Sequence, residues 1–305
     1  MQSVLITGIT GRSGKWFYQE LLQNREISER FKIAFVVRNK QKYLSMLQGD
    51  APVFDHYVAD IDDQEQMKEV FKRSGAKVLF HVAGVTHSLE LVKTAISCGV
   101  TRLVLVHTTG IYSKYKAVGK SYRAAEAQIE QLIKGRDIAL TILRPTMVYG
   151  SLDDMNISRF IRMVDRFKFF PVVQKGTFAL QPVNQRDLGK AYFAALTNLD
   201  ITANKNYNLS GSTPIDLIDI LKNISLYLGK RTYFFSVPLW FAYSGAVAVY
   251  FASFKRVDYR EKVKRLVEPR TFSHEEARAD FGYAPMPFLE GLHQEVEDYI
   301  QTKRR

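Results

Sequence analysis

The chain has 305 residues, of which 46% are hydrophobic and 24% charged, the composition of a globular protein with a full core. Its 43 Lys and Arg residues outnumber 31 Asp and Glu, and the resulting formal charge of +12 suits anionic ligands or an anionic membrane surface. The single cysteine, Cys98, excludes an internal disulfide framework. The single cysteine and the lack of a secretory signal pattern in the first residues together predict a cytoplasmic location. No helix-turn-helix, zinc or aromatic RNA-binding motif is present, so we expect no nucleic-acid partner.

Short β-branched runs alternate with amphipathic stretches as far as residue 150. The runs predict strands at 3–6, 32–37, 54–58, 77–82, 102–107 and 138–143. Helical patterns lie between them at 14–23, 63–73 and 88–98. Strands buried on both faces and separated by helices imply parallel βαβ units. Right-handed crossovers then give an α/β fold, a doubly wound Rossmann sheet with helices on both faces.

The pattern changes after residue 150. Helices are predicted at 153–167, 184–198, 213–229 and 273–282. Thr213 before Pro214 suits the start of the third, and a capping box from Ser273 suits the start of the fourth, which Gly282 ends. We therefore expect residues 1–150 to form a dinucleotide-binding core. Residues 151–305 should form mostly a smaller substrate lobe, with some elements packing back on the core.

A glycine-rich turn follows the first strand in the sequence VLITGITGRSGKW (4–16). Gly8 permits a tight turn, Gly11 lets the backbone approach a pyrophosphate, and Gly14 allows close packing of helix against strand. The free N–H groups at the helix N-terminus can then hold the anion. In this position, after the first strand of an α/β pattern, the motif predicts a dinucleotide site.

Basic residues favour NADP over NAD. The second strand ends at Arg38, where NAD-binding sheets usually place an acidic residue for the ribose 2′-hydroxyl. Arg38, helped by Arg12 in the glycine-rich turn, can accommodate a 2′-phosphate. A solvated arginine at a strand end is the alternative, and it leaves NAD possible.

The turn TGITGRSG (7–14) resembles the TGxxGxxG loop of the short-chain dehydrogenase/reductase superfamily, in its extended or atypical branch. Asp60-Ile61 resembles the position after the third strand where an acidic residue contacts the adenine. HVAG (81–84) resembles the segment after the fourth strand, and LRPTMVYG (143–150) resembles the turn near the nicotinamide. The cofactor residues that this resemblance and the turn imply are Gly8, Thr10, Gly11, Arg12, Ser13, Gly14, Arg38, Asp60, Ile61, Val82, Ala83, Gly84, Pro145 and Val148.

The C-terminal half extends the resemblance. Segments 179–196, 206–220 and 277–292 are similar to the substrate lobe of nucleotide-sugar epimerases and their steroid-dehydrogenase relatives. The resemblance implies an NADP-dependent oxidoreductase, epimerase or dehydratase that acts on a small molecule such as a nucleotide sugar or another anionic or hydrophobic ligand. The ligand would lie between the carboxyl edge of the sheet and the lobe.

The segment HTTGIYSKYKAVGKSYRAAEAQIEQL (107–132) raises the question of catalysis. Superfamily members that transfer hydride use a Tyr, a Lys four residues later and a Ser or Thr, because an ammonium stabilises the phenolate. Extended members usually carry a Glu four residues beyond the Lys. If Glu126 fills that position, Tyr122 replaces the Lys and Val118 the Tyr. Thr109 occupies the Ser/Thr position.

Three interpretations of this segment stay open. Tyr112 and Lys116 have the required spacing and are candidates for a displaced pair. Tyr122, or another tyrosine assisted by Lys116 or Lys120, is a second candidate. In the third, the pair is lost, as it often is in the NmrA-like group. The segment from Thr109 to Glu126 is short for the extended branch and favours this third interpretation. A protein that senses or assembles around NADP without turning it over is therefore the rival function.

The uncharged segment 232–254 is followed by the basic run 255–270. We expect a helix beginning near Pro238 and packed in the lobe. Alternatives are contact of residues 236–256 with the inner face of a membrane, as in a sterol-type or lipid-type dehydrogenase, or a true span. The basic run is compatible with a solvated surface, with contact to a diphosphate or with attraction to anionic lipid.

The histidines show no metal-binding spacing, so no metal site is predicted. The sequence is also compatible with an oligomer.

Overall fold

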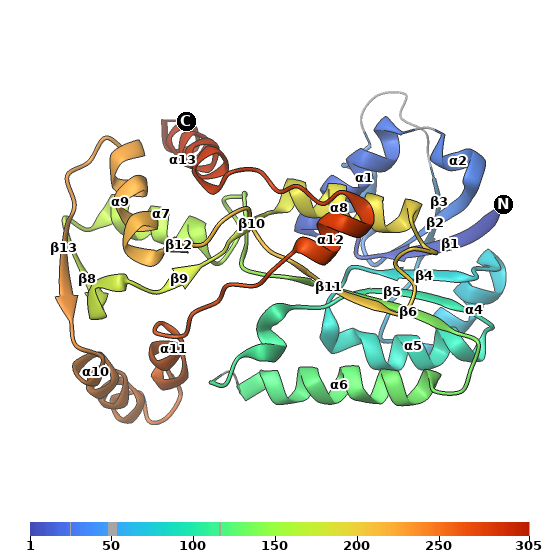
Figure 1. Ribbon diagram of the computed structural model, residues 1–305, viewed down its shortest axis with the longest axis horizontal. Helices are drawn as coiled ribbons and strands as arrows, with labels where there is room; N and C mark the ends of the chain where they lie inside the picture. Colours follow the sequence, from blue (N-terminus) through green and yellow to red (C-terminus); the bar gives the residue numbers. More distant parts are fainter. Residues whose placement is uncertain (25, 48–53, 116, 305) are drawn as a thin grey trace.

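Seven parallel strands form the central sheet, in the order β11-β6-β5-β4-β1-β2-β3 (Figure 1). The computed structural model describes residues 1–24, 26–47, 54–115 and 117–304. The strands are β1 (Gln2–Thr7), β2 (Phe31–Val37), β3 (Asp55–Val58), β4 (Val78–His81), β5 (Arg102–Val106), β6 (Ala139–Pro145) and β11 (Lys205–Leu209). The six strands predicted from the first 150 residues are confirmed, as is the Rossmann fold. The strand order reverses between β1 and β4, which is where such sheets bind ligands.

Helices cover both faces of this sheet. One face carries α1 (Arg12–Gln23), α2 (Ile27–Arg30), α3 (Lys40–Leu44), α8 (Gln185–Thr197) and α12 (Glu275–Phe281). The other carries α4 (Gln64–Ser74), α5 (Ser88–Ser97) and α6 (Ala117–Ile133). Two 3₁₀ turns, η1 (Val85–His87) and η2 (Thr109–Tyr112), follow β4 and β5. Strand β11 and helices α8 and α12 come from the second half of the chain and return to the core.

A second group of elements forms a lobe beside the carboxyl edge of the sheet (Figure 1). Its helices are α7 (Ile157–Arg166), α9 (Leu217–Tyr227), α10 (Leu239–Ala252), α11 (Arg260–Arg265) and α13 (Phe288–Arg304), and η3 (Gln174–Gly176) is a short turn. Its strands form three pairs, β7 (Val148–Tyr149) with β10 (Val183–Asn184), β9 (Ala179–Leu180) with β12 (Ile215–Asp216), and β8 (Phe169–Val173) with β13 (Tyr233–Val237). Apolar side chains of α7, α9 and α13 form a hydrophobic core separate from the two on the sheet.

The helix starts predicted at Thr213 and Ser273 differ from the observed ones for different reasons. The helix predicted from Thr213 begins at Leu217, because the preceding residues pair as β12 with β9. The capping box from Ser273 is wrong, since the Ser273 hydroxyl accepts a hydrogen bond from the N–H of Glu275 and the helix begins there. The predicted end at Gly282 is confirmed by its left-handed φ of 69°.

The segment 232–254 does not form the helix packed within the lobe that we expected. It contains β13 followed by α10, which does begin directly after Pro238. Of the described residues of α10, only Ala246 is buried, and Trp240 exposes 70% of its surface. Helix α10 contacts α11 and little else, because it lies at the tip of the lobe. None of the helices in the described part of the chain is long and apolar enough to cross a membrane.

Candidate functional site

The glycine-rich turn between β1 and α1 has the geometry of a phosphate loop. Gly8 has a φ of 78°, and a Cβ there would lie 2.7 Å from the backbone nitrogen of Ala83. A Cβ on Gly14 would lie 2.2 Å from the carbonyl oxygen of Gly8, so only glycine allows α1 to start this close to the strand. Gly11 is the N-cap of α1 and offers no side chain to its first N–H groups, which therefore remain available to an anion.

A cavity of about 460 Å³ lies beside this turn, at the carboxyl ends of β1, β2 and β4. The expected residues that line it are Gly8, Thr10, Gly11, Arg12, Ser13, Arg38, Asp60, Ile61, Val82, Ala83 and Val148. Gly14 does not line the cavity and instead packs closely against the carbonyl oxygen of Gly8. Among the described residues, Gly84 and Pro145 are not part of the lining. Eleven of the fourteen predicted cofactor residues therefore line one cavity at the reversal of the strand order, and the turn has the free backbone donors that a dinucleotide diphosphate requires.

The outer end of this cavity is basic. Arg38 and Lys42 both line it and both are exposed. The side chain of Asn39 caps α3 by accepting a hydrogen bond of 2.9 Å from the N–H of Lys42, which fixes the start of the helix that carries the lysine. Sequence reasoning missed Lys42. A basic residue four positions after Arg38, in the turn after the second strand, was the available signal.

Arg12 connects the cofactor turn to the lobe. Its guanidinium donates a hydrogen bond of 2.6 Å to the carbonyl oxygen of Asp153, and its Nε lies 3.4 Å from the Asp153 carboxylate. A hydrogen bond from Ser151, together with Arg12, holds the pKa of Asp153 below its usual value. Arg12 therefore joins the two halves of the site, because it lines the cofactor cavity together with Arg38 and also lines the cavity next to it.

His81, at the end of β4, shapes the turn that follows the strand. Its Nδ1 accepts a hydrogen bond of 2.7 Å from Thr7, and its Nε2 donates one of 3.0 Å to the carbonyl oxygen of Gly84. Complete burial lowers the pKa of His81 to about 4, so the imidazole is neutral at physiological pH. A neutral ring with both nitrogens engaged holds the backbone at Gly84, where φ is 97°.

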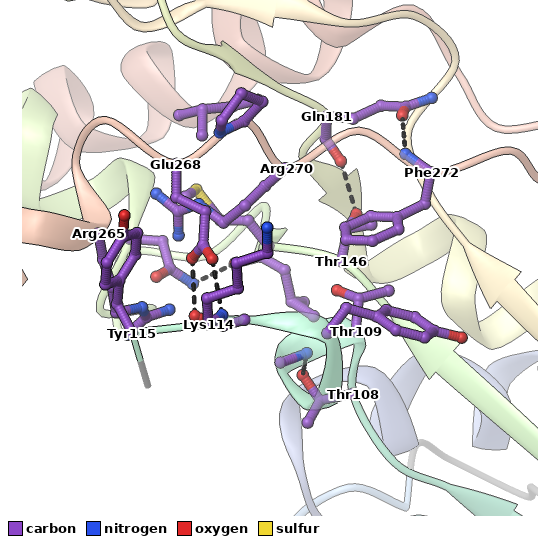
Figure 2. A pocket seen from close by; sticks show the side chains of 18 of the residues that line it. Thr108, Thr109, Lys114, Tyr115, Thr146, Gln181, Arg265, Glu268, Arg270 and Phe272 are labelled. Carbon is purple, nitrogen blue, oxygen red and sulfur yellow. Dashed lines mark hydrogen bonds between the residues drawn. The ribbon is translucent and has the colours of Figure 1, made fainter. Parts of the chain in front are cut away.

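A larger cavity, of about 730 Å³, adjoins the first at Arg12 and Val148 (Figure 2). Turn η2 forms one wall and the segment after α11 forms the opposite wall. The described residues that line it are Arg12, Thr108, Thr109, Gly110, Tyr112, Ser113, Lys114, Tyr115, Thr146, Met147, Val148, Asn156, Leu180, Gln181, Arg265, Val267, Glu268, Pro269, Arg270 and Phe272. This arrangement places a ligand cavity between the sheet edge and the lobe.

Two catalytic candidates lie in this wall. The Thr109 hydroxyl donates a hydrogen bond of 3.2 Å to the carbonyl oxygen of Pro145, which leaves its oxygen able to accept one from a ligand. The Tyr112 oxygen accepts a hydrogen bond of 3.2 Å from Arg144. The Tyr112 ring packs on Phe272, with 5.3 Å between the ring centroids. The phenol is 45% exposed and accessible from the cavity.

Tyr122, a further catalytic candidate, is not part of the cavity wall within the described part of the chain. It lies on α6. Lys116 lies outside the described residues.

Behind Tyr112 lies a buried polar network that fixes α6 on the sheet. Glu126 on α6 accepts hydrogen bonds from Nδ1 of His107, at 2.8 Å, and from Arg144, at 2.6 Å. Burial alone raises the pKa of Glu126, but the hydrogen bonds from His107 and Arg144 outweigh burial and hold it below its usual value. The hydroxyl of Ser88 lies 2.9 Å from the other ring nitrogen of His107. The network joins α5, β5, α6 and β6, and it neutralises the charge of the arginine that contacts Tyr112.

The segment after α11 brings charged groups to the opposite wall of the larger cavity (Figure 2). Glu268 accepts hydrogen bonds from the Ser113 hydroxyl, at 2.7 Å, and from the N–H of Lys114, at 2.8 Å, so this segment is held against η2. Arg265 and Arg270 also line the cavity. Their buried Nε groups have no hydrogen-bond partner among the described residues. Burial lowers the pKa of Arg270 to about 10, and the neighbouring charge of Arg265 adds to the shift. Arg270 therefore remains charged at neutral pH.

No cluster of His, Cys, Asp and Glu residues in the described ranges is arranged to hold a metal ion. What the site offers is backbone donors, hydroxyls, two exposed phenols, those of Tyr112 and Tyr115, and several cations. These groups suit phosphate-bearing organic molecules.

Comparison with known proteins supports this assignment. Residues 8–165 match the model of a family described as NAD(P)H-binding. The chain is 21% identical to a UDP-glucose 4-epimerase of Vibrio cholerae over all of this chain and 97% of that protein. It is 25% identical to a UDP-glucuronate 4-epimerase of Thermodesulfobacterium geofontis over 74% of this chain and 81% of the relative.

Solved structures share the fold at low sequence identity. The UDP-glucose 4-epimerase of Thermotoga maritima, solved with UDP-glucose, superposes with a TM-score of 0.72 at 18% identity, over 99% of this chain and 100% of that one. The UDP-glucuronic acid 4-epimerase of Bacillus cereus, solved with NAD, has a TM-score of 0.72 at 17% identity over 100% of both chains. The suspected resemblance to the extended short-chain dehydrogenase/reductase superfamily is confirmed, and with it a nicotinamide cofactor. The chain belongs to the NAD(P)H-binding family.

Proposed function

We propose that the protein is an NADP-dependent oxidoreductase or epimerase that acts on a hydroxyl or ketone group of an anionic substrate of the nucleotide-sugar class. The observation that carries this proposal is the pair of adjoining cavities, which share Arg12 and Val148. One cavity has the phosphate turn, and the other is lined by two arginines whose Nε groups have no hydrogen-bond partner in the described part of the chain. Two cavities joined in this way can hold a dinucleotide and a second phosphate-bearing molecule side by side.

Charge supports NADP as the cofactor. Arg38 and Lys42 line the end of the cofactor cavity where β2 terminates, the position at which a ribose 2′-phosphate is recognised. The adjacent acidic residues do not replace them. Asp62 lies 2.7 Å from Nδ1 of His87, and Asp60 accepts a hydrogen bond from the N–H of Asp62. Two exposed cations at this end favour the additional phosphate of NADP over the bare hydroxyl of NAD.

Charge also supports an anionic substrate. Arg265 and Arg270 line the larger cavity from the segment around and after α11, and Thr109 and Tyr112 line it from η2. A diphosphate held by these arginines would leave the sugar directed towards η2. The UDP-sugar epimerases with the same fold are named for substrates of this chemical class.

The reaction assigns separate tasks to two groups of η2. NADP, when bound, accepts or supplies hydride at a substrate carbon. Tyr112 would exchange a proton with the substrate oxygen, and Thr109, whose own proton is directed to Pro145, would accept a hydrogen bond from the substrate hydroxyl. The test incubates the full chain with NADP or NADPH and a panel of UDP-sugars and their keto forms. Product is followed by chromatography and the cofactor by the absorbance of reduced nicotinamide.

The Tyr112→Phe variant is expected to lose at least ~100-fold in turnover, the usual contribution of a positioned proton donor, while its cofactor affinity is unchanged. Tyr122→Phe, on the same segment but outside the cavity lining, is the matched control and should keep full turnover. Equal turnover in wild type and Tyr112→Phe would remove Tyr112 from the mechanism.

One observation favours a second function, cofactor binding without turnover. The cation that contacts the Tyr112 phenol is Arg144, and Glu126 already neutralises it. In the usual pair the cation is an uncompensated lysine. Saturable NADPH binding with no product from any member of the panel would support this second function over the first.

A further inference from the structure

Helix α10 presents an apolar face to solvent at the tip of the lobe (Figure 1). On a helical projection, the exposed residues of α10 occupy one continuous half of the helix. They are Trp240, Phe241, Ser244, Gly245, Ala248, Val249, Phe251 and Ala252. The aromatic members are strongly exposed, with 70% for Trp240, 60% for Phe241 and 62% for Phe251. An exposed apolar surface of this kind marks an interaction site.

The apolar face carries almost no polar group that requires hydration. Residues 232–254 contain no charged side chain. The single hydroxyl on the face, that of Ser244, donates a hydrogen bond of 2.9 Å to the carbonyl oxygen of Trp240 and is therefore satisfied within the helix. A surface helix in water normally carries charges on its exposed side. On α10 the exposed side is apolar instead.

The opposite side of α10 is fixed by cations of α11. The ammonium of Lys264 lies 5.0 Å from the ring centroid of Tyr243, and the guanidinium of Arg260 lies 3.9 Å from that of Tyr250. These cation–π contacts hold the polar helix α11 on the inner side of α10. The apolar face is consequently directed outward by the packing.

The end of α10 exposes one more aromatic side chain next to two cations. Phe254 is 88% exposed, and it and Lys255 have φ angles of 52° and 64°, a left-handed turn that such side chains adopt only at a cost. The turn places Phe254, Lys255 and Arg256 together at the exposed C-terminal end of the apolar helix. An aromatic ring and two cations in this arrangement suit the boundary between acyl chains and headgroups.

Basic groups surround both ends of this apolar face. The run 255–270 contains seven basic and three acidic residues. At the N-terminal end of α10, an open cavity of about 690 Å³ is lined by apolar and aromatic side chains together with Lys175 and Lys264. Cations around an apolar helix match the phosphates around the acyl region of an anionic bilayer.

We infer that α10 is a monotopic anchor, which lies in the surface of a membrane containing anionic phospholipid, with its apolar face among the acyl chains and the cations of 255–270 on the headgroups. The helix has 14 residues and is ~21 Å long, too short for the ~30 Å hydrocarbon core, so it lies along the surface and does not cross. A second copy of the chain would bring the same basic flanks together, and like charges oppose such a dimer. The anchor is additional to the proposed catalytic function and does not depend on it.

The test uses the full chain and sedimentation with vesicles of phosphatidylcholine alone or mixed with phosphatidylglycerol. We expect sedimentation with the mixed vesicles, at least tenfold more than with the neutral ones, and a decrease as salt is raised. A Trp16→Phe variant leaves Trp240 as the only tryptophan. Its fluorescence should shift to shorter wavelength on vesicle binding.

Two variants remove the two components of the surface separately. Phe251→Glu places a charge in the apolar face, and Lys255→Glu/Arg256→Glu reverses two cations at its end; each should abolish sedimentation. The matched controls are Leu226→Glu on α9, at a side chain 68% exposed, and Lys134→Glu/Arg136→Glu at the end of α6, and both should sediment like wild type. Unchanged NADPH affinity in all four variants shows that the core is folded.

Two results would overturn the inference. One is wild-type protein that stays in the supernatant with mixed vesicles at low salt. The other is a dimer in sedimentation velocity without lipid that Phe251→Glu converts to monomer, because a second copy of the chain would then cover the face.

Discussion

Arg144 on β6 and Glu126 on α6 form a buried ion pair, with 2.6 Å between Nη2 of the arginine and Oε2 of the glutamate. The same arginine donates a hydrogen bond to the Tyr112 oxygen, so a single guanidinium joins the helix, the central sheet and the wall of the ligand cavity. The position of the cavity wall thus depends on a charge pair that is largely shielded from solvent.

Removing one member of this pair should be strongly destabilising. Glu126→Gln leaves the buried guanidinium without a counter-charge, and we expect a loss of about 3–5 kcal/mol in the free energy of unfolding at pH 7, measured by urea denaturation. Because the pKa of Glu126 is depressed in the folded state, its stabilising contribution is present above the unfolded pKa of about 4.3 and is lost as pH falls through the folded value. Glu130→Gln, exposed one turn later on α6, is the control and should change stability little. A Glu126→Gln protein as stable as wild type would contradict the importance of the pair.

The phosphate turn should not tolerate a methyl group at Gly14. The Cβ of Gly14→Ala would lie 2.2 Å from the carbonyl oxygen of Gly8, so the backbone must move. We expect a loss of about 1–3 kcal/mol in the free energy of unfolding and at least a tenfold increase in the Kd for NADPH, measured by calorimetry. Gly245→Ala on α10, where no described heavy atom lies within 4 Å of the new Cβ, is the control. It should stabilise the helix by roughly 0.5–1 kcal/mol and leave the Kd unchanged. Normal cofactor binding by Gly14→Ala would show that the turn does not hold the diphosphate.

A buried carboxyl group should make the free energy of unfolding decrease as the pH rises into the alkaline range. Burial, with the charge of Asp154 as the next cause, raises the pKa of Glu295 to about 9. The protonated form is favoured in the folded protein, so the stabilising contribution is complete below the unfolded pKa of about 4.3 and is lost as pH rises towards 9.

The Glu295→Gln variant keeps the acceptor for the N–H of Gly150, which lies 3.0 Å from Oε2 in the wild type, and it cannot ionise. Its free energy of unfolding relative to wild type should therefore increase between pH 6 and pH 9, by about 3–4 kcal/mol, measured by urea denaturation at each pH. Glu297→Gln, exposed on the same helix, should show no such increase. A constant difference between Glu295→Gln and wild type would mean that Glu295 is ionised throughout this range.

Cofactor preference should depend on Arg38. Removing the guanidinium in Arg38→Ala is expected to raise the Kd for NADP about tenfold, equivalent to ~1.4 kcal/mol, and to leave the Kd for NAD unchanged. Lys40→Ala, an exposed cation two residues later that is not among the described residues lining the cavity, is the control. Titration calorimetry with both cofactors measures the ratio. Equal losses for NAD and NADP would assign Arg38 to the shared part of the dinucleotide.

The local pattern of the sequence was sufficient to predict the strands of the core and the cofactor side of the site. The spacing of Gly8, Gly11 and Gly14 after a buried strand specifies the phosphate turn, because both the turn and the motif are formed by consecutive residues. Arg38 follows directly from the end of the second strand. The alternation of β-branched runs and amphipathic stretches predicted all six strands, since burial on both faces of a parallel sheet leaves a continuous apolar run.

Tertiary structure alone decided the substrate side of the site and the exposure of α10. Glu268 and Arg270 reach the turn at Tyr112 from more than 150 residues along the chain, and no local period indicates which cavity they enter. The apolar composition of 239–252 fitted a buried helix and an exposed one equally well. Composition determines that a segment avoids water, but the neighbouring elements determine which of its faces are covered. Among the described elements, α11 makes the main contact with this helix.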